Sequence, residues 1–285
     1  MTESDEIVAQ QREFWNGSGS KMWVEQAQRT DATLAPVLDA LLVHADVKRG
    51  ERVLDIGCGT GASVLALGER AGQDGQVMGL DISEPLLSLA RERIGCQPHI
   101  RLELGDAATY RFPSAETDLL FSRFGVMFFG DPKAAFANMR AAMSAQGRLC
   151  FACWQKISAN PWVDIPQSRV ESLLPERPSS VQGIPGQFSF ADTGRVTDIL
   201  TSASFGSPIF TPFEFAILLG QTLEQAVERS CAFGVTGRLL AEQSEQVRQH
   251  AAEAIREGLR EHVTTDGAVT LPGRVWIVSA RVTPL

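Results

Sequence analysis

Residues 53–61 read VLDIGCGTG and join a short apolar run to a segment with the pattern of a helix. Gly57, Gly59 and Gly61 fall between the two. Glycine lets the backbone approach a ligand closely, and the N terminus of a following helix offers free N–H groups to an anionic group. The stretch therefore predicts a ligand-binding turn between a strand and a helix.

Around this turn, short apolar runs alternate with amphipathic helical runs, which is typical of a parallel sheet with helical crossovers. The apolar runs are rich in Val, Ile, Leu and Phe and alternate poorly in polarity, as expected for strands buried on both faces. The expected strands are residues 52–57, 76–81, 99–106, 118–123, 147–154, 207–218 and 268–282. The pattern predicts an α/β fold with a doubly wound sheet.

Helical segments precede and interrupt this order. We expect an N-terminal helical cap (1–49), followed by the sheet domain (50–285) with helical insertions at about 155–190 and 221–263. Residues 31–45 have apolar side chains at helical spacing, and Asp31 is the expected N-cap of that helix. The second insertion carries an apolar stripe at four-residue intervals, which suits either a cap over the substrate or a homodimer surface.

Composition and charge narrow the class of partner. The chain is 44% hydrophobic and 21% charged, as in ordinary globular proteins. Its formal net charge of −8 lacks the positive excess expected of a nucleic-acid-binding protein. No apolar run approaches the roughly 20 residues needed to span a bilayer, and the acidic N terminus does not resemble a signal peptide. We expect a cytoplasmic protein with a small-molecule partner, no nucleic acid and no membrane span.

The five cysteines include Cys150 and Cys153, which have C-x-x-C spacing within a predicted strand. Positions i and i+3 of a strand point to opposite faces, which is wrong for a shared metal ion or a dithiol. We therefore expect reduced core thiols and no metal site.

Three carboxylates follow one another at the ends of the first three predicted strands. Asp55 precedes Gly57 by two residues, Asp81 ends the second strand, and Asp106 follows the third. They suit an ammonium group, a pair of ribose hydroxyls and the exocyclic amine of adenine, respectively. Each also has a simpler interpretation, such as helix capping near Ser83 for Asp81. Three together converge on the crevice where ligands of such sheets bind.

These motifs resemble those of the class I S-adenosylmethionine-dependent methyltransferases. VLDIGCGTG is similar to their first motif, GLDIS (79–83) to their ribose-binding acidic position, and GDA (105–107) to their adenine-binding position. DLLFSRFGVMFFGDP (118–132) resembles the fourth-strand motif of the small-molecule subgroup that includes ubiquinone/menaquinone-biosynthesis methyltransferases. The resemblance covers about 50–155, and 14–49 more loosely.

The resemblance implies a Rossmann-like, seven-stranded sheet whose last strand is antiparallel, and it implies a role for each matching residue. Asp55, Gly57 and Gly59 would contact the methionine part of the cofactor, with Cys58 in the same binding set. Asp81 would bind the ribose, Ile82 would pack on adenine, and Asp106 and Ala107 would read the adenine edge. Ser122 and Arg123 would border the reacting methyl group.

The expected function is therefore an enzyme that transfers a methyl group from S-adenosylmethionine to oxygen, nitrogen or carbon of a small molecule, leaving S-adenosylhomocysteine. The fourth strand ends in Ser-Arg-Phe-Gly, not in the Asn-Pro-Pro-aromatic run of enzymes that methylate exocyclic amines of bases or glutamine. Trp23 and Phe124 are the preferred acceptor-pocket residues, and no general base stands out.

Two alternatives remain open at this point. The spacing Gly57-x-Gly59-x-x-Ala62 also fits a loose dinucleotide fingerprint, which would indicate a nicotinamide-dependent oxidoreductase. That interpretation gives no purpose to Asp55 or to the Gly-Asp-Ala run. The other alternative is a protein that binds S-adenosylmethionine without catalysing transfer.

Overall fold

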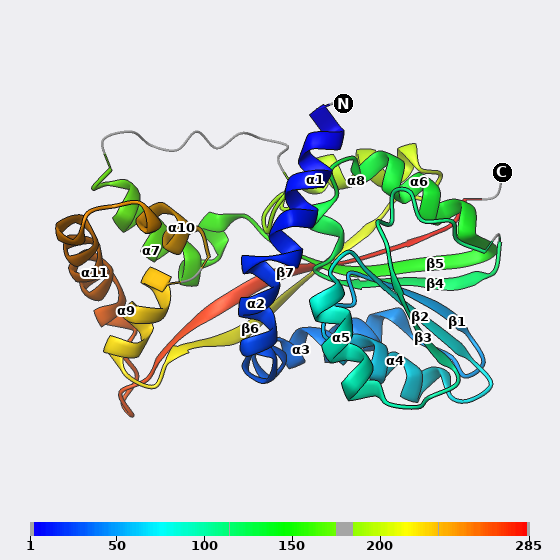
Figure 1. The fold of residues 1–285 in the computed structure, drawn as a ribbon, viewed down its shortest axis with the longest axis horizontal. Coiled ribbons are helices and arrows are strands. Elements are labelled where there is room, and N and C mark those ends of the chain that lie inside the picture. Colours follow the sequence, from blue (N-terminus) through cyan, green and yellow to red (C-terminus); the bar gives the residue numbers. More distant parts are fainter. Residues whose placement is uncertain (1–2, 114, 175–184, 233, 284–285) are drawn as a thin grey trace. The chain divides into compact units, whose positions relative to one another are not determined.

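The computed structural model describes residues 3–113, 115–174, 185–232 and 234–283 (Figure 1). The chain divides into two compact units. The first comprises Met1–Trp154, Gly183–Phe213 and Val275–Leu285, and the second Gln155–Gln182 and Glu214–Arg274. The second unit contains most of the two predicted insertions, of which residues 175–184 lie outside the described part of the chain.

The described strands form one seven-stranded sheet in the order β3-β2-β1-β4-β5-β7-β6. Their bounds are β1 (Arg52–Ile56), β2 (Gln76–Asp81), β3 (Ile100–Leu104), β4 (Thr117–Arg123), β5 (Met143–Trp154), β6 (Ile209–Gly220) and β7 (Val269–Arg281). Neighbours from β3 to β5 pair in parallel, and β7 pairs antiparallel to β5. The predicted sheet with its antiparallel last strand is confirmed.

The order of strands reverses between β1 and β4. The chain runs outward from β1 to β2 and β3, and then returns to place β4 on the other side of β1. In open α/β sheets a crevice forms at the carboxyl ends of the strands at such a reversal, and ligands bind there. The turns after β1 and β4 therefore mark the expected site.

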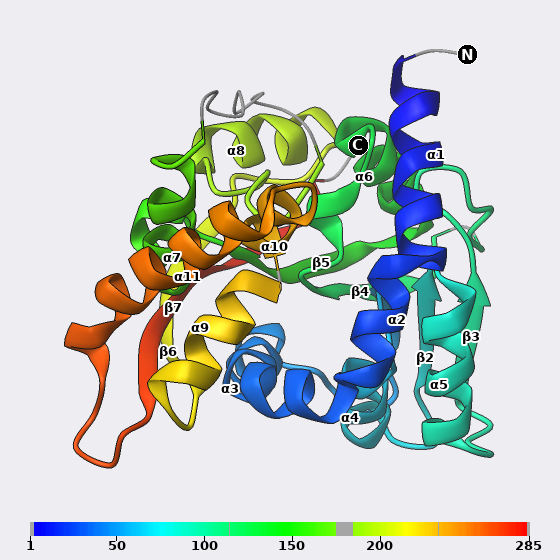
Figure 2. The ribbon, with the colours of Figure 1, turned by 60° about the vertical axis from the view of Figure 1, so that its left-hand side comes forward.

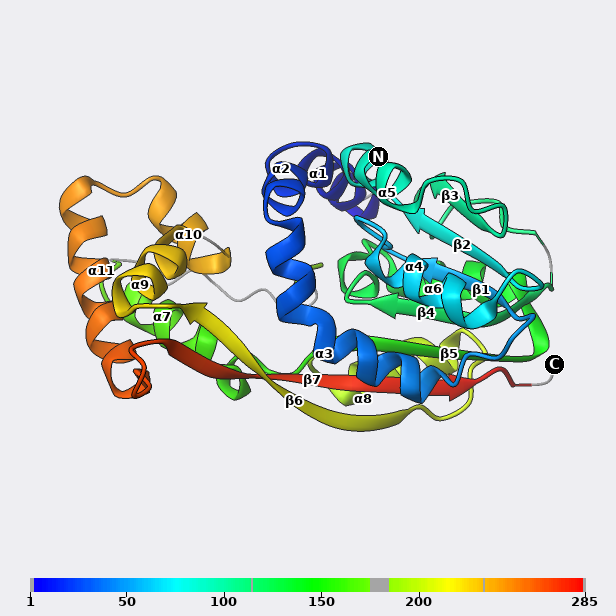
Figure 3. The ribbon, with the colours of Figure 1, turned by 90° about the horizontal axis from the view of Figure 1, so that it is seen from below.

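Helices of the first unit cover both faces of the sheet. On one face, α3 (Ala27–Ala45) packs on β4 and β5, α4 (Ala62–Ala71) on β1 and β2, and α5 (Glu84–Ile94) on β2 and β3. Figures 2 and 3 show α6 (Pro132–Ala142) and α8 (Thr193–Ser202) on the opposite face. The strands between the two layers are buried. The exceptions are the two edge strands: β3 is half-buried, with Leu104 exposed, and β6 has mostly exposed or half-buried residues, with Ile209 exposed.

Two further helices precede α3: α1 (Glu3–Asn16) and α2 (Ser18–Glu25), the latter packed beside α5 (Figure 1). The helix predicted over 31–45 begins earlier, because the break between α2 and α3 falls at Gln26. The prediction of Asp31 as an N-cap is therefore wrong. Asp31 lies inside α3, where its carboxylate binds two arginines instead of capping backbone N–H groups.

Cys150 and Cys153 are buried and contact different parts of the first unit. The Cys150 thiol donates to the carbonyl of Leu41 in α3, whereas the Cys153 thiol donates to the carbonyl of Phe190. Burial raises the pKa of Cys150 to about 12, so the thiol stays protonated. The prediction of core thiols is confirmed for this pair.

The second unit contains α7 (Pro161–Glu171), α9 (Leu223–Ala232), α10 (Gly234–Ala241) and α11 (Glu245–Leu259), gathered in Figure 1. Its α11 packs on α7 and α9. The buried amide of Asn160 fixes the start of α7. Its Nδ2 donates to the carbonyls of Gln155, Lys156 and Arg274, and its Oδ1 accepts from the backbone N–H of Arg274. This satisfied amide joins the segments that enter and leave the unit.

Candidate functional site

The turn after β1 is the floor of a cavity in the first unit. Gly57, Gly59 and Gly61 all have positive φ, and a Cβ on Gly57 would lie 2.6 Å from the Cα of Gly125. Two backbone turns, one after β1 and one after β4, therefore meet where only glycines fit. No side chain caps the N terminus of α4, which follows this turn.

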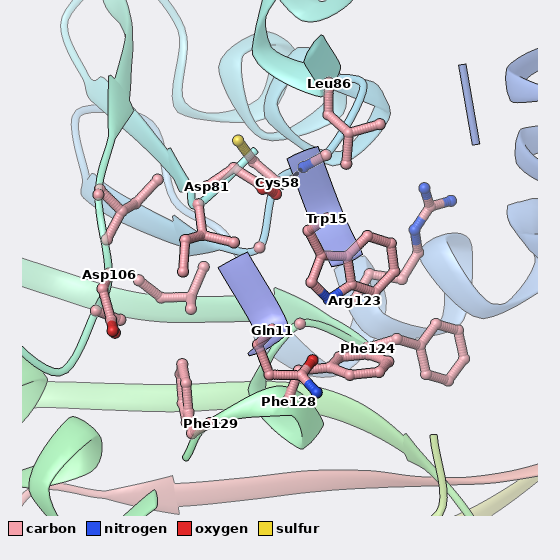
Figure 4. Close-up of a pocket in the computed structure, with 18 of the residues that line it drawn as sticks. Gln11, Trp15, Cys58, Asp81, Leu86, Asp106, Arg123, Phe124, Phe128 and Phe129 are labelled. Carbon is pink, nitrogen blue, oxygen red and sulfur yellow. Dashed lines mark hydrogen bonds between the residues drawn. The ribbon is translucent and has the colours of Figure 1, made fainter. Parts of the chain in front are cut away.

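Residues from the N-terminal helices and from the ends of β1 to β4 with the segments that follow them line this cavity (Figure 4). They are Val8, Gln11, Trp15, Trp23 and Leu34; Ile56 to Thr60 and Ser63; Leu80 to Ile82 and Leu86; Gly105 to Ala107; Arg123 to Gly125; and Phe128 to Gly130. All of them belong to the first unit. Of the sequence-predicted residues, Gly57, Cys58, Gly59, Asp81, Ile82, Asp106, Ala107, Arg123, Trp23 and Phe124 are brought together here, whereas Asp55 and Ser122 do not line the cavity.

Asp81 ends β2 and turns its carboxylate toward the glycine loop. One oxygen accepts from the N–H of Gly59 at 2.8 Å and the other from the N–H of Ser83 at 2.9 Å. Burial raises the pKa of Asp81, and these backbone hydrogen bonds oppose that rise. The carboxylate thus holds the loop and the start of α5 while it lines the cavity. Ser83 itself caps α5, because its hydroxyl accepts from Leu86 N–H.

The Gly105-Asp106-Ala107 turn follows β3 at another side of the cavity. One Asp106 oxygen accepts from the N–H of Ala108 at 2.9 Å. Asn138 Nδ2 donates to the carbonyls of Ala107 and Tyr110, at 2.8 and 2.9 Å, and so ties the turn to α6. A polar side chain and backbone amides are thereby held in a fixed geometry at the cavity wall.

Asp55 and Ser122 lie beneath the floor. Asp55 is fully buried; one oxygen accepts from the hydroxyl of Ser63 at 2.5 Å, and the other has no hydrogen-bond partner among the described residues. Burial raises the pKa of Asp55 to about 7, a rise that the Ser63 hydrogen bond and the charge of Arg123 oppose. Ser122 Oγ donates to the carbonyl of Ile56 and accepts from the N–H of Gly125, so it joins the turns after β1 and β4.

The N-terminal helix α1 roofs the cavity with Val8, Gln11 and Trp15. Its C-terminal end is fastened to the start of α5 by three hydrogen bonds. The Ser83 hydroxyl donates to the carbonyl of Trp15, Asn16 Nδ2 donates to the carbonyl of Ile82, and Asn16 Oδ1 accepts from the N–H of Glu84. The roof is therefore bound to the same strand–helix junction that presents Asp81.

Aromatic rings form the wall beyond the glycine loop. Trp15 contacts Trp23 and meets Phe128 edge to face, with ring centroids 6.2 and 5.2 Å apart. Phe124 stacks on Trp154 at 4.8 Å. The backbone of Phe124 has φ of +71°, which is strained for a bulky side chain. This conformation follows directly after β4 and sends the ring to the cavity wall.

The sequence predicted an N-terminal helical cap but did not assign its first helix, α1, to the cofactor or acceptor site residue by residue. Val8, Gln11 and Trp15 are spaced three and four residues apart, which places them on one face of a helix. That spacing was the signal that would have found them as a set. Leu34 of α3 and Leu86 of α5 had no signal beyond ordinary core spacing.

Within the described residues, no group of three or more His, Cys, Asp or Glu side chains is arranged to hold a metal ion. No helix there is long and apolar enough to cross a membrane.

Comparison with known proteins shows which family the segment that contains the glycine loop matches. Residues 53–147 match the family described as "Methyltransferase domain". A demethylmenaquinone methyltransferase of Deinococcus radiodurans is 31% identical over 183 residues, which cover 58% of this chain and 76% of that protein. Aklanonic acid methyltransferase DauC of Streptomyces sp. (strain C5) is 37% identical over 105 residues, or 36% of this chain and 47% of that protein.

Among solved structures, phosphoethanolamine N-methyltransferase 2 of Haemonchus contortus, in complex with phosphomonomethylethanolamine and S-adenosylhomocysteine, has a TM-score of 0.52. It is 18% identical to this chain, and the match covers 88% of this chain and 53% of that one. At this identity the likeness establishes the fold. The chain spans less than two thirds of the length of several of these relatives, including about half of the DauC protein.

Proposed function

The chain belongs to the class I S-adenosylmethionine-dependent methyltransferases, and we propose that it transfers a methyl group from S-adenosylmethionine to a small-molecule acceptor. The observation that carries the proposal is the meeting of Asp81, Asp106 and the Gly57–Gly61 loop around one cavity at the sheet reversal. A glycine loop alone also suits a dinucleotide, whereas this set of carboxylates suits a nucleoside joined to an amino acid.

The residues present fit the cofactor. Apart from Gly59 and its two chain neighbours, no atom of the described residues lies within 4 Å of where a Cβ on Gly59 would be, so the loop leaves open space beside its backbone. Asp81 presents a carboxylate at the wall for the ribose hydroxyls, and Ile82 offers an apolar surface for adenine. We propose that Asp106 and the N–H of Ala107 read the adenine edge.

We assign the methionine part to Gly57, Cys58 and Gly59, with Asp55 and Ser122 supporting the loop from beneath. The partnerless oxygen of Asp55 is a buried acceptor for an ammonium group below the loop, reached directly or through ordered water. Ser122 and Arg123, at the end of β4, border the position of the reacting methyl group. These roles are proposals supported by the positions of the residues around one cavity.

When bound, S-adenosylmethionine supplies a sulfonium methyl group that is already activated for in-line displacement. The chain's own contribution is then to align the acceptor and to exclude water. The α1 roof and the rings of Trp15, Phe124 and Phe128 give the cavity apolar walls suited to both tasks. A general base is needed only for an acceptor that must lose a proton.

A small molecule with an apolar portion is the acceptor class that we propose. Trp23 and Phe124 line the cavity with Phe128 and Phe129. The relatives named for aklanonic acid and demethylmenaquinone support a small-molecule acceptor. The cytoplasmic location and the absence of a nucleic-acid partner remain predictions of the sequence, as does the homodimer, which is one of the two uses that the sequence suggests for the 221–263 insertion.

Equilibrium binding tests the cofactor. We expect the folded protein to bind S-adenosylhomocysteine and S-adenosylmethionine, and NAD to compete poorly. Lack of binding by both nucleosides, with the protein folded by circular dichroism, would contradict the proposal. Tight NAD binding would favour the oxidoreductase instead.

Transfer itself is tested with radiolabelled methyl donor and a cell extract separated into small molecules, protein and nucleic acid. The label is expected on a small molecule that chromatography separates from the unreacted S-adenosylmethionine. Cofactor binding without transfer of label to any other molecule would support a binding protein that does not catalyse transfer.

A further inference from the structure

Arg123 lines the cavity and carries a buried hydrogen-bond donor that has no partner among the described residues. Its side chain is only 10% exposed, and the donor without a partner is its Nη1. A guanidinium stays charged at any pH relevant to proteins, and a buried donor left unpaired costs free energy. Such a group in a cavity wall fits an anionic ligand.

A chain of ion pairs holds this guanidinium in place. The other terminal nitrogen of Arg123 donates to Asp31 in α3 at 3.2 Å. The second oxygen of the same carboxylate accepts from Arg93 in α5 at 2.6 Å. Arg93 in turn donates to the carbonyl and the hydroxyl of Thr60, at 3.0 and 2.9 Å. The cluster is thereby fixed to the glycine loop itself.

The charges of this cluster do not cancel. One carboxylate, Asp31, serves two guanidinium groups, Arg93 and Arg123, which leaves an excess of one positive charge. The carboxylate of Asp55 also attracts the guanidinium of Arg123, but Asp55 lies beneath the floor and does not line the cavity. An anion that enters the cavity at this end therefore meets a guanidinium that shares its ion-pair partner Asp31 with Arg93.

We propose that the free Nη1 of Arg123 binds the carboxylate of the methionine part of the cofactor, with Asp31 as the residue that positions it. This rests on the proposed function. The cluster is fixed at Thr60, beside the glycine loop, and Figure 4 shows Arg123 and Asp106 on opposite sides of the cavity. A cofactor with its adenine at Asp106 has its amino-acid end at Arg123.

Two ligands that differ in this carboxylate test the proposal. S-adenosylhomocysteine carries it, whereas 5′-S-(3-aminopropyl)-5′-thioadenosine keeps the adenosine, the thioether and the amine and lacks it. We expect Arg123→Met to weaken binding of the first about 10- to 100-fold and of the second less than about 3-fold, the range of a charged hydrogen bond. Isothermal titration calorimetry measures both affinities.

Equal losses for the two ligands would overturn the proposal, because they would show a general disturbance of the cavity. Unchanged affinity for S-adenosylhomocysteine would also overturn it, and would leave Arg123 to an anionic acceptor. If the wild-type protein binds neither ligand, the proposed function itself fails, which is a separate outcome.

Two further variants keep the test decisive. Arg123→Lys retains the charge without the planar fork, and we expect it to lose less affinity for S-adenosylhomocysteine than Arg123→Met does. It serves as the readout if Arg123→Met does not fold. Arg52→Met is the matched control, because Arg52 begins β1 at the opposite end of the strand and pairs with Glu116 and Asp118. Both affinities should stay unchanged in that variant.

Discussion

The two halves of the cavity are built in different ways. The proposed adenosine half consists of Asp81, Ile82, Asp106 and Ala107, which follow consecutive strands of a parallel sheet. The proposed acceptor half consists of Trp15 and Trp23 from the N-terminal helices together with the aromatic residues after β4. The first half depends on chain order alone, whereas the second depends on how distant segments pack.

This difference gives the two halves of the cavity different physical properties. Carboxylates and backbone amides at strand ends are held by hydrogen bonds of fixed geometry, as in the Asp81–Gly59 contact. The aromatic wall is held by ring contacts such as that between Trp15 and Phe128, which tolerate substitution by other apolar side chains. We infer that the adenosine half determines cofactor affinity and that the acceptor half determines which molecule is methylated.

The largest expected effect comes from Asp81→Asn, which tests this division directly. Loss of the charge weakens hydrogen bonds to the ribose hydroxyls, by about 1.5–3 kcal/mol for a charged acceptor. We expect affinity for S-adenosylhomocysteine to fall about 10- to 100-fold in calorimetric titrations. The asparagine retains one oxygen for the N–H of Gly59 or Ser83, so the fold should persist.

Trp23→Ala is the matched variant in the other half. It should leave affinity for S-adenosylhomocysteine within about twofold while it lowers methyl transfer to any acceptor found. Comparable losses of cofactor affinity in the two variants would mean that the cavity does not divide into an adenosine half and an acceptor half.

The sequence predicted the adenosine half because its residues follow strands that the apolar runs already define. The carboxyl ends of neighbouring parallel strands meet at one edge, so Asp81 and Asp106 needed no further information to be brought together. The antiparallel last strand, in contrast, was predicted from the family resemblance.

The other features of the site depend on tertiary packing, which local sequence patterns do not predict. Asp31 looked like a helix cap because it precedes an apolar periodic run, whereas it is an ion-pair partner of Arg93 and Arg123, 62 and 92 residues away. The positive φ of Phe124 has no sequence signal, since glycine and asparagine are the residues that usually indicate it. Asp55 was expected to contact the cofactor, but whether a strand-end carboxylate lines a cavity or lies under it depends on the turn above.

Asp55 gives a pH-dependent test of the site, because it lies beneath the cavity floor and carries a titratable charge. Its pKa is raised by burial from an ordinary value near 3.8 to about 7. Between about pH 4 and 7 the folded protein therefore holds a proton that the unfolded chain has released. The free energy of unfolding should fall as pH rises through this window, with a slope approaching about 1.4 kcal/mol per pH unit.

Asp55→Asn removes this dependence, because the amide does not titrate. Urea denaturation of both proteins at pH 5, 6, 7 and 8 measures it: the wild type should lose stability relative to the variant as pH increases. Parallel curves would show that Asp55 keeps an ordinary pKa. A second readout is proton release on binding S-adenosylhomocysteine near pH 7, since an ammonium group nearby favours the ionised carboxylate.

The smallest expected effect concerns the hydrogen bonds that join the two halves. Asn16 ends α1 and bonds to the backbone of Ile82 and Glu84, so it fastens the roof of the acceptor half to the adenosine half. Asn16 is exposed, and each such bond contributes about 0.5–1.5 kcal/mol. Asn16→Ala should therefore loosen the roof and accelerate dissociation of S-adenosylhomocysteine several-fold, with a smaller change in the association rate.

Stopped-flow intrinsic fluorescence follows the dissociation, because two of the five tryptophans, Trp15 and Trp23, line the cavity. Gln10→Ala is the control, because Gln10 is exposed on the same helix and does not line the cavity. If both variants release the ligand at the wild-type rate, the hydrogen bond of the Ser83 hydroxyl to the carbonyl of Trp15 suffices to hold the roof. The two halves would then be joined through the cap of α5, and the same Asp81 turn would control both.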